Sequence, residues 1–157
     1  MSKRIVYLTA GPAMIVPEVM KQVHRELIDH ANLGISVMEM SHRSLEFEML
    51  RDEVERDLRR LLAIPDNYSV LFMHGGAKTQ FDSIPMNLCP ENSETDYIVT
   101  GTWSKLAAAD AEKHATVHKQ VVPDSFTRAP KPDELKSQGN VRYRYYCDNE
   151  TVQGGAN

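Results

Sequence analysis

The sequence predicts an α/β domain with a largely parallel sheet. Two short apolar runs, residues 69–74 (SVLFMH) and 96–101 (DYIVTG), have the length of buried strands. Residues 119–122 and 142–147 are weaker strand candidates. Segments with helical features lie between these runs, and strands that alternate with helices are typical of a parallel sheet. The chain of 157 residues is long enough for one domain of ordinary size.

Two helices are expected before the first strand. Pro17 suits the first position of a helix. Apolar residues then recur at helical spacing, at Val19, Val23 and Leu27. Asn32 and Gly34 indicate where this segment stops. The second helix has a stronger apolar stripe, formed by Phe47, Leu50, Val54, Leu58 and Leu61. Pro65 lies just past its expected end.

Two more helices are expected between the strands. Residues 77–88 favour a helix at their start, with a disturbance at Pro85. Residues 103–114 are rich in alanine, the residue that most favours a helix. The stretch of residues 123–139, which is polar and contains several prolines, predicts a surface excursion within the domain.

Composition and charge argue against several classes of function. The chain is 41% hydrophobic and 25% charged, as globular proteins are, and its net charge of -4 argues against a nucleic-acid partner. No apolar run approaches the roughly 20 residues that span a bilayer, so no membrane association is expected. Neither the cysteines, Cys89 and Cys147, nor the histidines have the spacing of metal ligands. Without a signal peptide at its start, the chain is expected to be cytoplasmic.

Two segments carry groups that suit an anion. In residues 74–80 (HGGAKTQ), two glycines follow a strand candidate and precede a helix, so that free N–H groups and the helix dipole can face a phosphate. A plain tight turn is the alternative. Residues 41–44 (SHRS) precede the long helix, and Arg43, with His42 beside it, can hold a carboxylate or phosphate. A helix cap with solvated neighbours is the alternative there.

Two further segments follow strand candidates, at the position where ligands of open α/β sheets bind. Residues 100–104 (TGTWS) contain Trp103, the only tryptophan, whose indole can stack on a planar ring or fill a place in the core. Residues 147–151 (CDNET) offer polar side chains for ligand contacts, and a capped turn suits them equally. Together these observations predict an anion site and an aromatic platform near the strand ends.

Read together, six segments resemble the phosphoserine aminotransferases, pyridoxal-phosphate enzymes of serine biosynthesis. They are AGPA (10–13), GISVMEMSHRS (34–44), IPDNY (64–68), GGAKTQF (75–81), DYIVTGTWSK (96–105) and YCDNET (146–151). They occur in the order and at the spacing of that family, from about residue 5 to about residue 154. GISVMEMSHRS and the TGTWSK block are the specific ones.

The resemblance implies a fold and a reaction. The fold would be the three-layer α/β/α large domain of the aspartate-aminotransferase type (fold type I), mostly parallel and truncated. The reaction would be reversible transamination between glutamate and 3-phosphohydroxypyruvate, which gives phosphoserine and 2-oxoglutarate. The family also implies a pyridoxal 5'-phosphate cofactor and a homodimer with active sites at its interface.

The resemblance also assigns cofactor contacts to named residues. The backbone of Ala77 and Lys78, in the turn that includes Gly76, would bind the cofactor phosphate. Trp103 would stack on the pyridine ring, and the hydroxyl of Thr151 would lie beside the phenolic oxygen of that ring. Each role agrees with the chemistry of the residues themselves.

At the substrate, Arg43 matches the arginine that holds a carboxylate, and His42 matches its neighbour at the anionic end. The chain departs from the family at Lys78, where a small or neutral residue, or sometimes arginine, is common, and at Asp82, where a small residue is usual. An acid one helical turn from a phosphate would oppose its binding slightly.

Length is the largest departure from the family. Residues 1–157 are expected to form the N-terminal segment and the first part of the large cofactor-binding domain, with the rest of that domain and the small C-terminal domain absent. The Schiff-base lysine would then lie beyond Asn157, and the chain alone would not catalyse transamination. One alternative is a shortened, non-catalytic relative that binds the cofactor weakly or pairs with a full-length subunit. Another is a different fold-type-I enzyme, against which the SHRS and NET motifs argue.

Overall fold

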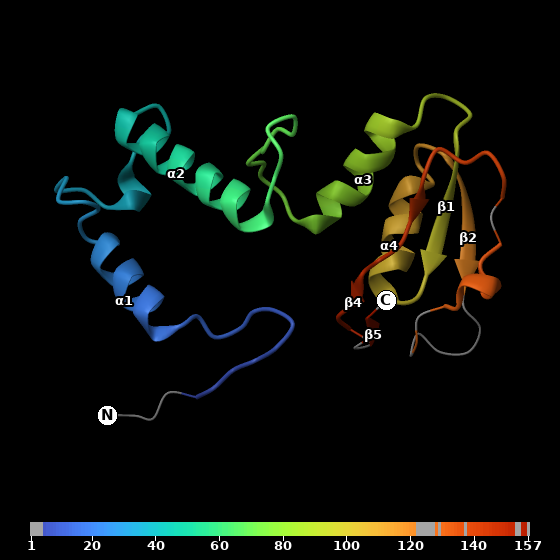
Figure 1. Cartoon of the computed structure of the whole chain (residues 1–157), viewed down its shortest axis with the longest axis horizontal. Helices are drawn as coiled ribbons and strands as arrows, with labels where there is room; N and C mark the ends of the chain where they lie inside the picture. The colour runs from blue at the N-terminus through green and yellow to red at the C-terminus, as the bar shows by residue number, and fades with distance from the viewer. Residues whose placement is uncertain (1–4, 122–127, 129, 137, 153–154, 157) are drawn as a thin grey trace. The chain divides into compact units, whose positions relative to one another are not determined.

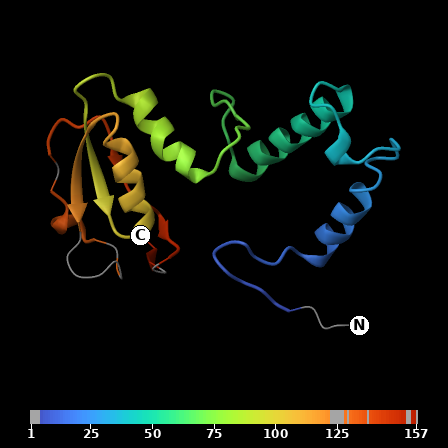
Figure 2. The same ribbon diagram turned by 180° about the vertical axis from the view of Figure 1, so that it is seen from behind.

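A computed structural model describes residues 5–121, 128, 130–136, 138–152 and 155–156. The chain divides into two compact units, Met1–Phe72 and Met73–Asn157, which are described separately below (Figure 1 and, from behind, Figure 2). The surface excursion predicted for residues 123–139 lies in large part outside the described residues. No helix in the described ranges is both long enough and apolar enough to cross a membrane.

The first unit contains the two helices that the sequence predicts before residue 65. Helix α1 spans Pro17–Glu26 and has its proline in the first turn, where the missing N–H leaves no carbonyl unpaired. A short 3-10 helix, Val37–Glu39, follows. Ser36 caps it, because its hydroxyl accepts from the N–H of Met38 at 3.2 Å and its own N–H donates to Glu39 at 2.9 Å.

Helix α2 spans Leu45–Leu62. It begins where the hydroxyl of Ser44 accepts a hydrogen bond from the N–H of Phe47 at 3.3 Å. It ends at Ala63, whose left-handed backbone (φ 51°) stops the helical repeat. Neither α1 nor α2 contains a buried residue, so their apolar stripes are open within this unit.

The strand predicted for residues 69–74 is wrong for this structure. These residues are in neither a helix nor a strand, and the side chains of Leu71 and Phe72 are 74% and 54% exposed. A strand needs a hydrogen-bonding neighbour. Within the described part of the chain, no segment pairs with these residues, so their apolar composition alone does not make them a strand.

The second unit is built around three parallel strands. Strand β1 (Glu94–Val99) lies between β2 (Thr116–Val121) and β3 (Arg144–Tyr145). Helix α4 (Thr102–Ala111) connects β1 to β2, as a parallel pair requires. The predicted α/β class with a parallel sheet is therefore confirmed. The strands are displaced from the predicted ranges, since β1 and β2 both begin earlier and β3 covers only part of 142–147; Val122 lies outside the described residues.

The core of this unit lies between β1 and α4. Ala107, Ala108 and Ala111 of α4 are fully buried against Tyr97 and Val99 of β1. Alanine lets the helix approach the sheet closely, and the aromatic rings fill the remaining space. The rings of Tyr97 and Tyr145 stack with centroids 4.8 Å apart.

Helix α3 spans Ala77–Leu88 and packs against α4. The disturbance predicted at Pro85 does not interrupt it: the helix continues past Pro85 to Leu88, and the carbonyl of Pro85 accepts from the N–H of Cys89 at 2.9 Å. Strands β4 (Asn149–Glu150) and β5 (Gly155–Ala156) form an antiparallel pair, and a 3-10 turn covers Pro132–Glu134. Both α3 and α4 begin at the end of the unit where β1 finishes (Figure 1).

Candidate functional site

The start of α3 is a tight glycine turn. Gly75 has a left-handed backbone (φ 102°), and a Cβ added there would lie 2.5 Å from the hydroxyl oxygen of Thr79. Gly76 is the residue before the helix, and no side chain caps the helix in the described structure. The turn is therefore tight, as the plainer interpretation has it. It also leaves backbone N–H groups at a helix start without a side-chain partner, which suits an anion.

Gly76, Ala77 and Lys78 are all exposed, so an anion could reach this helix start. Asp82, one turn further on, was expected to oppose it. The structure pairs Asp82 with the side chains of Lys113 and His114, each at 3.3 Å. Partial burial is the largest influence on Asp82 and raises its pKa, but these partners outweigh it and hold that pKa below its usual value. The negative charge is thus compensated locally.

The start of α4 differs, because a buried carboxylate occupies it. Glu150 accepts hydrogen bonds from the N–H of Trp103 and the N–H of Ser104, both at 2.8 Å. The hydroxyl of Ser104 accepts in turn from the N–H of Gly101 at 3.1 Å. This N-terminus is therefore already satisfied by the protein itself.

Trp103 lies beside Thr151. The indole Nε1 donates to the hydroxyl oxygen of Thr151 at 2.8 Å. Trp103 is 37% exposed and is not a member of the buried cluster, so it does not belong to the core of this unit. Because an indole nitrogen only donates, the Thr151 oxygen accepts here and its own proton is left for another acceptor. A phenolic oxygen of a stacked ring is such an acceptor.

His42 and Arg43 belong to the first unit, whereas the predicted cofactor residues belong to the second. Both are exposed, in a turn where the N–H of Arg43 donates to the hydroxyl of Ser41 at 3.3 Å. The cap of α2 is supplied by Ser44 and not by the guanidinium. Across the described residues, no carboxylate pairs with Arg43, so this side chain is available to a ligand.

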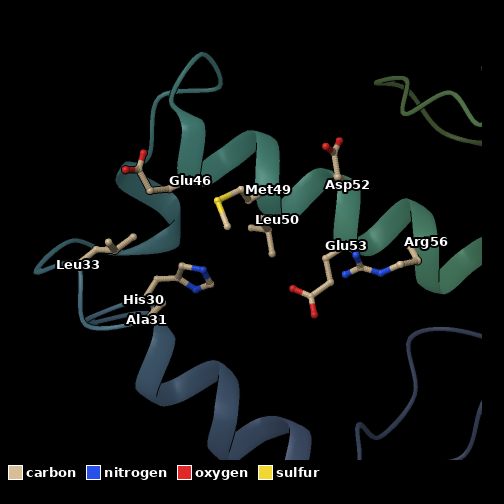
Figure 3. A pocket seen from close by; sticks show the side chains of 9 residues that line it. All are labelled: His30, Ala31, Leu33, Glu46, Met49, Leu50, Asp52, Glu53 and Arg56. Carbon is tan, nitrogen blue, oxygen red and sulfur yellow. The ribbon is translucent and has the colours of Figure 1, made fainter.

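A separate pocket of about 580 Å³ lies in the first unit, between the end of α1 and the face of α2 (Figure 3). It holds none of the predicted site residues. Its lining is formed by His30, Ala31, Leu33, Glu46, Met49, Leu50, Asp52, Glu53 and Arg56. Figure 3 shows charged side chains around a small apolar centre, which gives no indication of a specific ligand.

Sequence reasoning missed Glu150. Its motif was recognised, but the motif did not reveal that this side chain reaches the start of a helix 46 residues earlier in the chain. The only hint is Gly101, where a Cβ would lie 2.5 Å from the Glu150 carboxyl carbon. The expectation that the chain holds no metal stays a prediction, although no cluster of three metal-ligating side chains occurs among the described residues.

Comparison with known proteins gives a consistent family. Residues 5–157 match the model of the aminotransferase class-V family. The chain is 42% identical over 152 residues to a phosphoserine aminotransferase of Drosophila melanogaster, covering 96% of this chain and 42% of that protein. The chain therefore spans less than half the length of this relative.

Solved structures agree. A phosphoserine aminotransferase from Bacillus circulans superposes with a TM-score of 0.86 and 36% identity, over 96% of this chain and 42% of that one. A phosphoserine aminotransferase from Trichomonas vaginalis, solved with pyridoxal phosphate bound, gives a TM-score of 0.85 and 36% identity, over 96% and 43%. Both are fold-type-I aminotransferases, and the chain has the part of that fold that it covers.

Proposed function

The chain belongs to the class-V aminotransferase family, and on that premise we propose that its second unit supplies the phosphate-binding and ring-binding parts of a pyridoxal-phosphate site. The observations that carry this proposal are the contact between Trp103 and Thr151 at the start of α4 and the uncapped start of α3. The start of α3 supplies an anion site. The indole of Trp103 supplies a planar platform, with the hydroxyl of Thr151 beside it. Pyridoxal phosphate, when bound, supplies the electron sink for chemistry at an amino-acid α-carbon.

Each residue of the second unit has a role that its contacts support. The N–H groups of Ala77 and Lys78, two exposed residues that follow Gly76, would donate to the phosphate, and the Lys78 ammonium would add a positive charge. Trp103 offers a ring face whose orientation is held by Thr151. The Thr151 hydroxyl would donate to the phenolic oxygen of a bound cofactor, because its oxygen accepts from the indole and its proton is not used in that contact.

The reaction that this site would serve is transamination between glutamate and 3-phosphohydroxypyruvate, with phosphoserine and 2-oxoglutarate as products. Arg43 binds a substrate carboxylate through its planar fork, and His42 adds a donor at the same end. Both substrates carry anionic groups, which a guanidinium without a carboxylate partner can pair with. A homodimer and a cytoplasmic location belong to the same proposal; neither cysteine forms a disulfide in the described structure, which suits a reducing compartment.

A binding comparison tests the cofactor site. Purified chain is titrated with pyridoxal phosphate and with pyridoxal, and Trp103 fluorescence and ligand absorbance are followed. We expect quenching by pyridoxal phosphate at much lower concentration than by pyridoxal, because only the former engages α3. Lys78→Gln should narrow that difference, while Lys136→Gln, at an exposed lysine elsewhere in the unit, should not. Equal affinity for both ligands would rule out the phosphate cradle.

A second candidate function is a non-catalytic partner of a full-length subunit. One observation favours it: α1 and α2 expose apolar residues that a partner could cover. Mixing the chain with a full-length phosphoserine aminotransferase and measuring mass by analytical ultracentrifugation tests this. A stable mixed species, together with no release of 2-oxoglutarate by the chain alone, would favour the partner function over an independent enzyme.

A further inference from the structure

Glu150 is a deeply buried carboxylate of the second unit whose two oxygens both have hydrogen-bond partners. Its side chain is 1% exposed, and each of its oxygens accepts one backbone N–H of α4 at 2.8 Å. Burying a carboxylate is costly unless hydrogen bonds and positive potential compensate it. The start of α4 supplies both, since it offers N–H groups and the positive end of the helix dipole.

The lack of a side chain at Gly101 leaves room for the Glu150 carboxylate. A Cβ at Gly101 would lie 2.5 Å from the carboxyl carbon of Glu150 and 2.6 Å from one of its oxygens. The backbone of Gly101 is extended (φ -177°), a conformation that any residue adopts. The glycine is therefore needed for the approach of Glu150 and not for the shape of the chain.

The contacts of Glu150 and Thr151 converge on one residue. Glu150 holds the backbone N–H of Trp103, and Thr151 holds its indole Nε1. These two consecutive residues therefore hold both the backbone and the side chain of the tryptophan. Displacing the Glu150 carboxylate would break the hydrogen bond to the Trp103 N–H. It would also move the neighbouring Thr151, which accepts from the indole Nε1.

Glu150 also distinguishes the two helix starts of this unit. The start of α4 carries a buried negative charge, which repels an incoming phosphate. The start of α3 has no side-chain cap in the described structure and carries Lys78. A phosphorylated ligand is thereby directed to the start of α3 and away from the start of α4.

We propose that Glu150 is a positioning residue that sets the orientation of the Trp103 ring platform and reserves the start of α3 for the phosphate. This inference rests on the proposed cofactor site and adds a residue that has no contact with the cofactor itself. Glu150 should therefore affect both the mobility of Trp103 in the ligand-free chain and the affinity for pyridoxal phosphate.

The ligand-free statement is tested by the fluorescence of Trp103, the only tryptophan in the chain. Glu150→Gln keeps the size of the side chain but places an amide N–H₂ against a backbone N–H, so one contact is lost. We expect lower anisotropy and faster acrylamide quenching of Trp103 than in the unmodified chain. Glu112→Gln is the matched control, because Glu112 pairs with Lys119 beyond the other end of α4; it should leave both readouts unchanged.

Binding is tested with pyridoxal phosphate as the probe. Glu150→Gln should raise its dissociation constant about tenfold, equivalent to about 1.4 kcal/mol, and should reduce the preference for pyridoxal phosphate over pyridoxal. If the unmodified chain does not bind pyridoxal phosphate, the proposed function fails while the ligand-free test still decides the positioning role. Unchanged Trp103 anisotropy and quenching in Glu150→Gln would overturn the inference even where binding is seen.

Gly101→Ala provides a second route if Glu150→Gln does not fold, as judged by circular dichroism. The added methyl pushes the unmodified carboxylate from its place, so the same Trp103 changes are expected. The two substitutions should be non-additive, since they disturb one contact. Wild-type fluorescence in Gly101→Ala, or fully additive effects in the double variant, would contradict the inference.

Discussion

Arg43 is a single exposed side chain whose surroundings leave it free for a ligand. Arg51, only two helical turns further along, has the opposite situation: its guanidinium donates to Asp52 at 2.7 and 3.0 Å. The two arginines therefore form a natural pair for comparison. The guanidinium of Arg51 is paired with a carboxylate, whereas that of Arg43 is available to a ligand.

Arg43→Lys should weaken the binding of glutamate to the chain. Lysine keeps the charge but loses the planar fork, and hydrogen bonds to charged groups are worth about 1.5–3 kcal/mol, so the dissociation constant should rise on the order of ten- to a hundredfold. Isothermal calorimetry measures it. Arg51→Lys should change neither glutamate binding nor the melting temperature by much. Equal glutamate affinity in both variants would remove Arg43 from the proposed substrate site.

At this scale, the sequence predicted residue types better than contacts. Trp103 and Thr151 were each recognised from motifs that follow strands, and they do meet. The role of Glu150 depends on a contact between segments 46 and 47 residues apart. No local pattern encodes that distance, because it is set by how β4 returns to the start of α4.

Among the elements, α3 and α4 are joined by a polar network at their surface. Lys113 donates to Asp110 at 2.7 Å and to Asp82 at 3.3 Å, and His114 approaches Asp82 from the same side. Asp82, an unexpected acid for the proposed phosphate site, is thus the group that connects the two helices. Its position beside α4 could not be predicted without the packing of α3.

Asp82→Asn should lower the melting temperature slightly at neutral pH. The folded pKa of Asp82 lies below its usual value, so its stabilising effect is present above the unfolded pKa, near 4. That effect is lost as the pH falls through the folded pKa. The difference between wild type and variant should therefore shrink in thermal melts below about pH 4. A difference that persists unchanged at low pH would mean that the network does not depend on the Asp82 charge.

The tyrosines between sheet and helices give the opposite dependence on pH. Burial raises the pKa of Tyr145 to about 12, with a smaller contribution from the charge of Cys147. The neutral phenol is therefore favoured in the folded state. Stability is retained below the unfolded pKa, near 10, and is lost as the pH rises through the folded value.

Tyr145→Phe should reduce the loss of stability at alkaline pH. Phenylalanine keeps the stacked ring but has no proton to lose, so the melting temperature of wild type should fall more than that of the variant between about pH 10 and 12. Thermal melts followed by circular dichroism provide the measurement. Tyr68→Phe, at an exposed tyrosine of the first unit, is the control and should follow wild type. Parallel curves for Tyr145→Phe and wild type would show that this ring does not limit alkaline stability.

Element types were more predictable than strand partners. The helices at 17–26 and 45–62 follow from apolar spacing and caps, which act locally. The strand expected at 69–74 has apolar composition but no neighbour in the described structure, and composition cannot supply one. Pro85 likewise does not end α3, although an internal proline removes one backbone hydrogen bond.

On the scale of the whole chain, the two units differ in how they are stabilised. The second unit has a buried cluster around Tyr97, Val99 and Ala108. In the first unit, Ser36 is the only buried residue among those described. Helices with no buried face gain little beyond their own propensity, which is marginal for lengths such as those of α1 and α2. This contrast was not visible in the sequence, where both halves have similar apolar patterns.

Hydrogen exchange followed by mass spectrometry should therefore separate the units. We expect the amides of β1 and α4 to exchange slowly, since their opening requires disruption of the core, and those of α1 and α2 to exchange within the dead time or shortly after it. Ala108→Gly should accelerate exchange throughout the second unit, because it removes a buried methyl group and lowers helix propensity. It should leave the exchange rates of the α1 and α2 amides unchanged, because Ala108 belongs to the other unit. Protection in α2 equal to that in α4 would show that the first unit is stabilised by something other than a core of its own, such as self-association, which exchange at several protein concentrations would reveal.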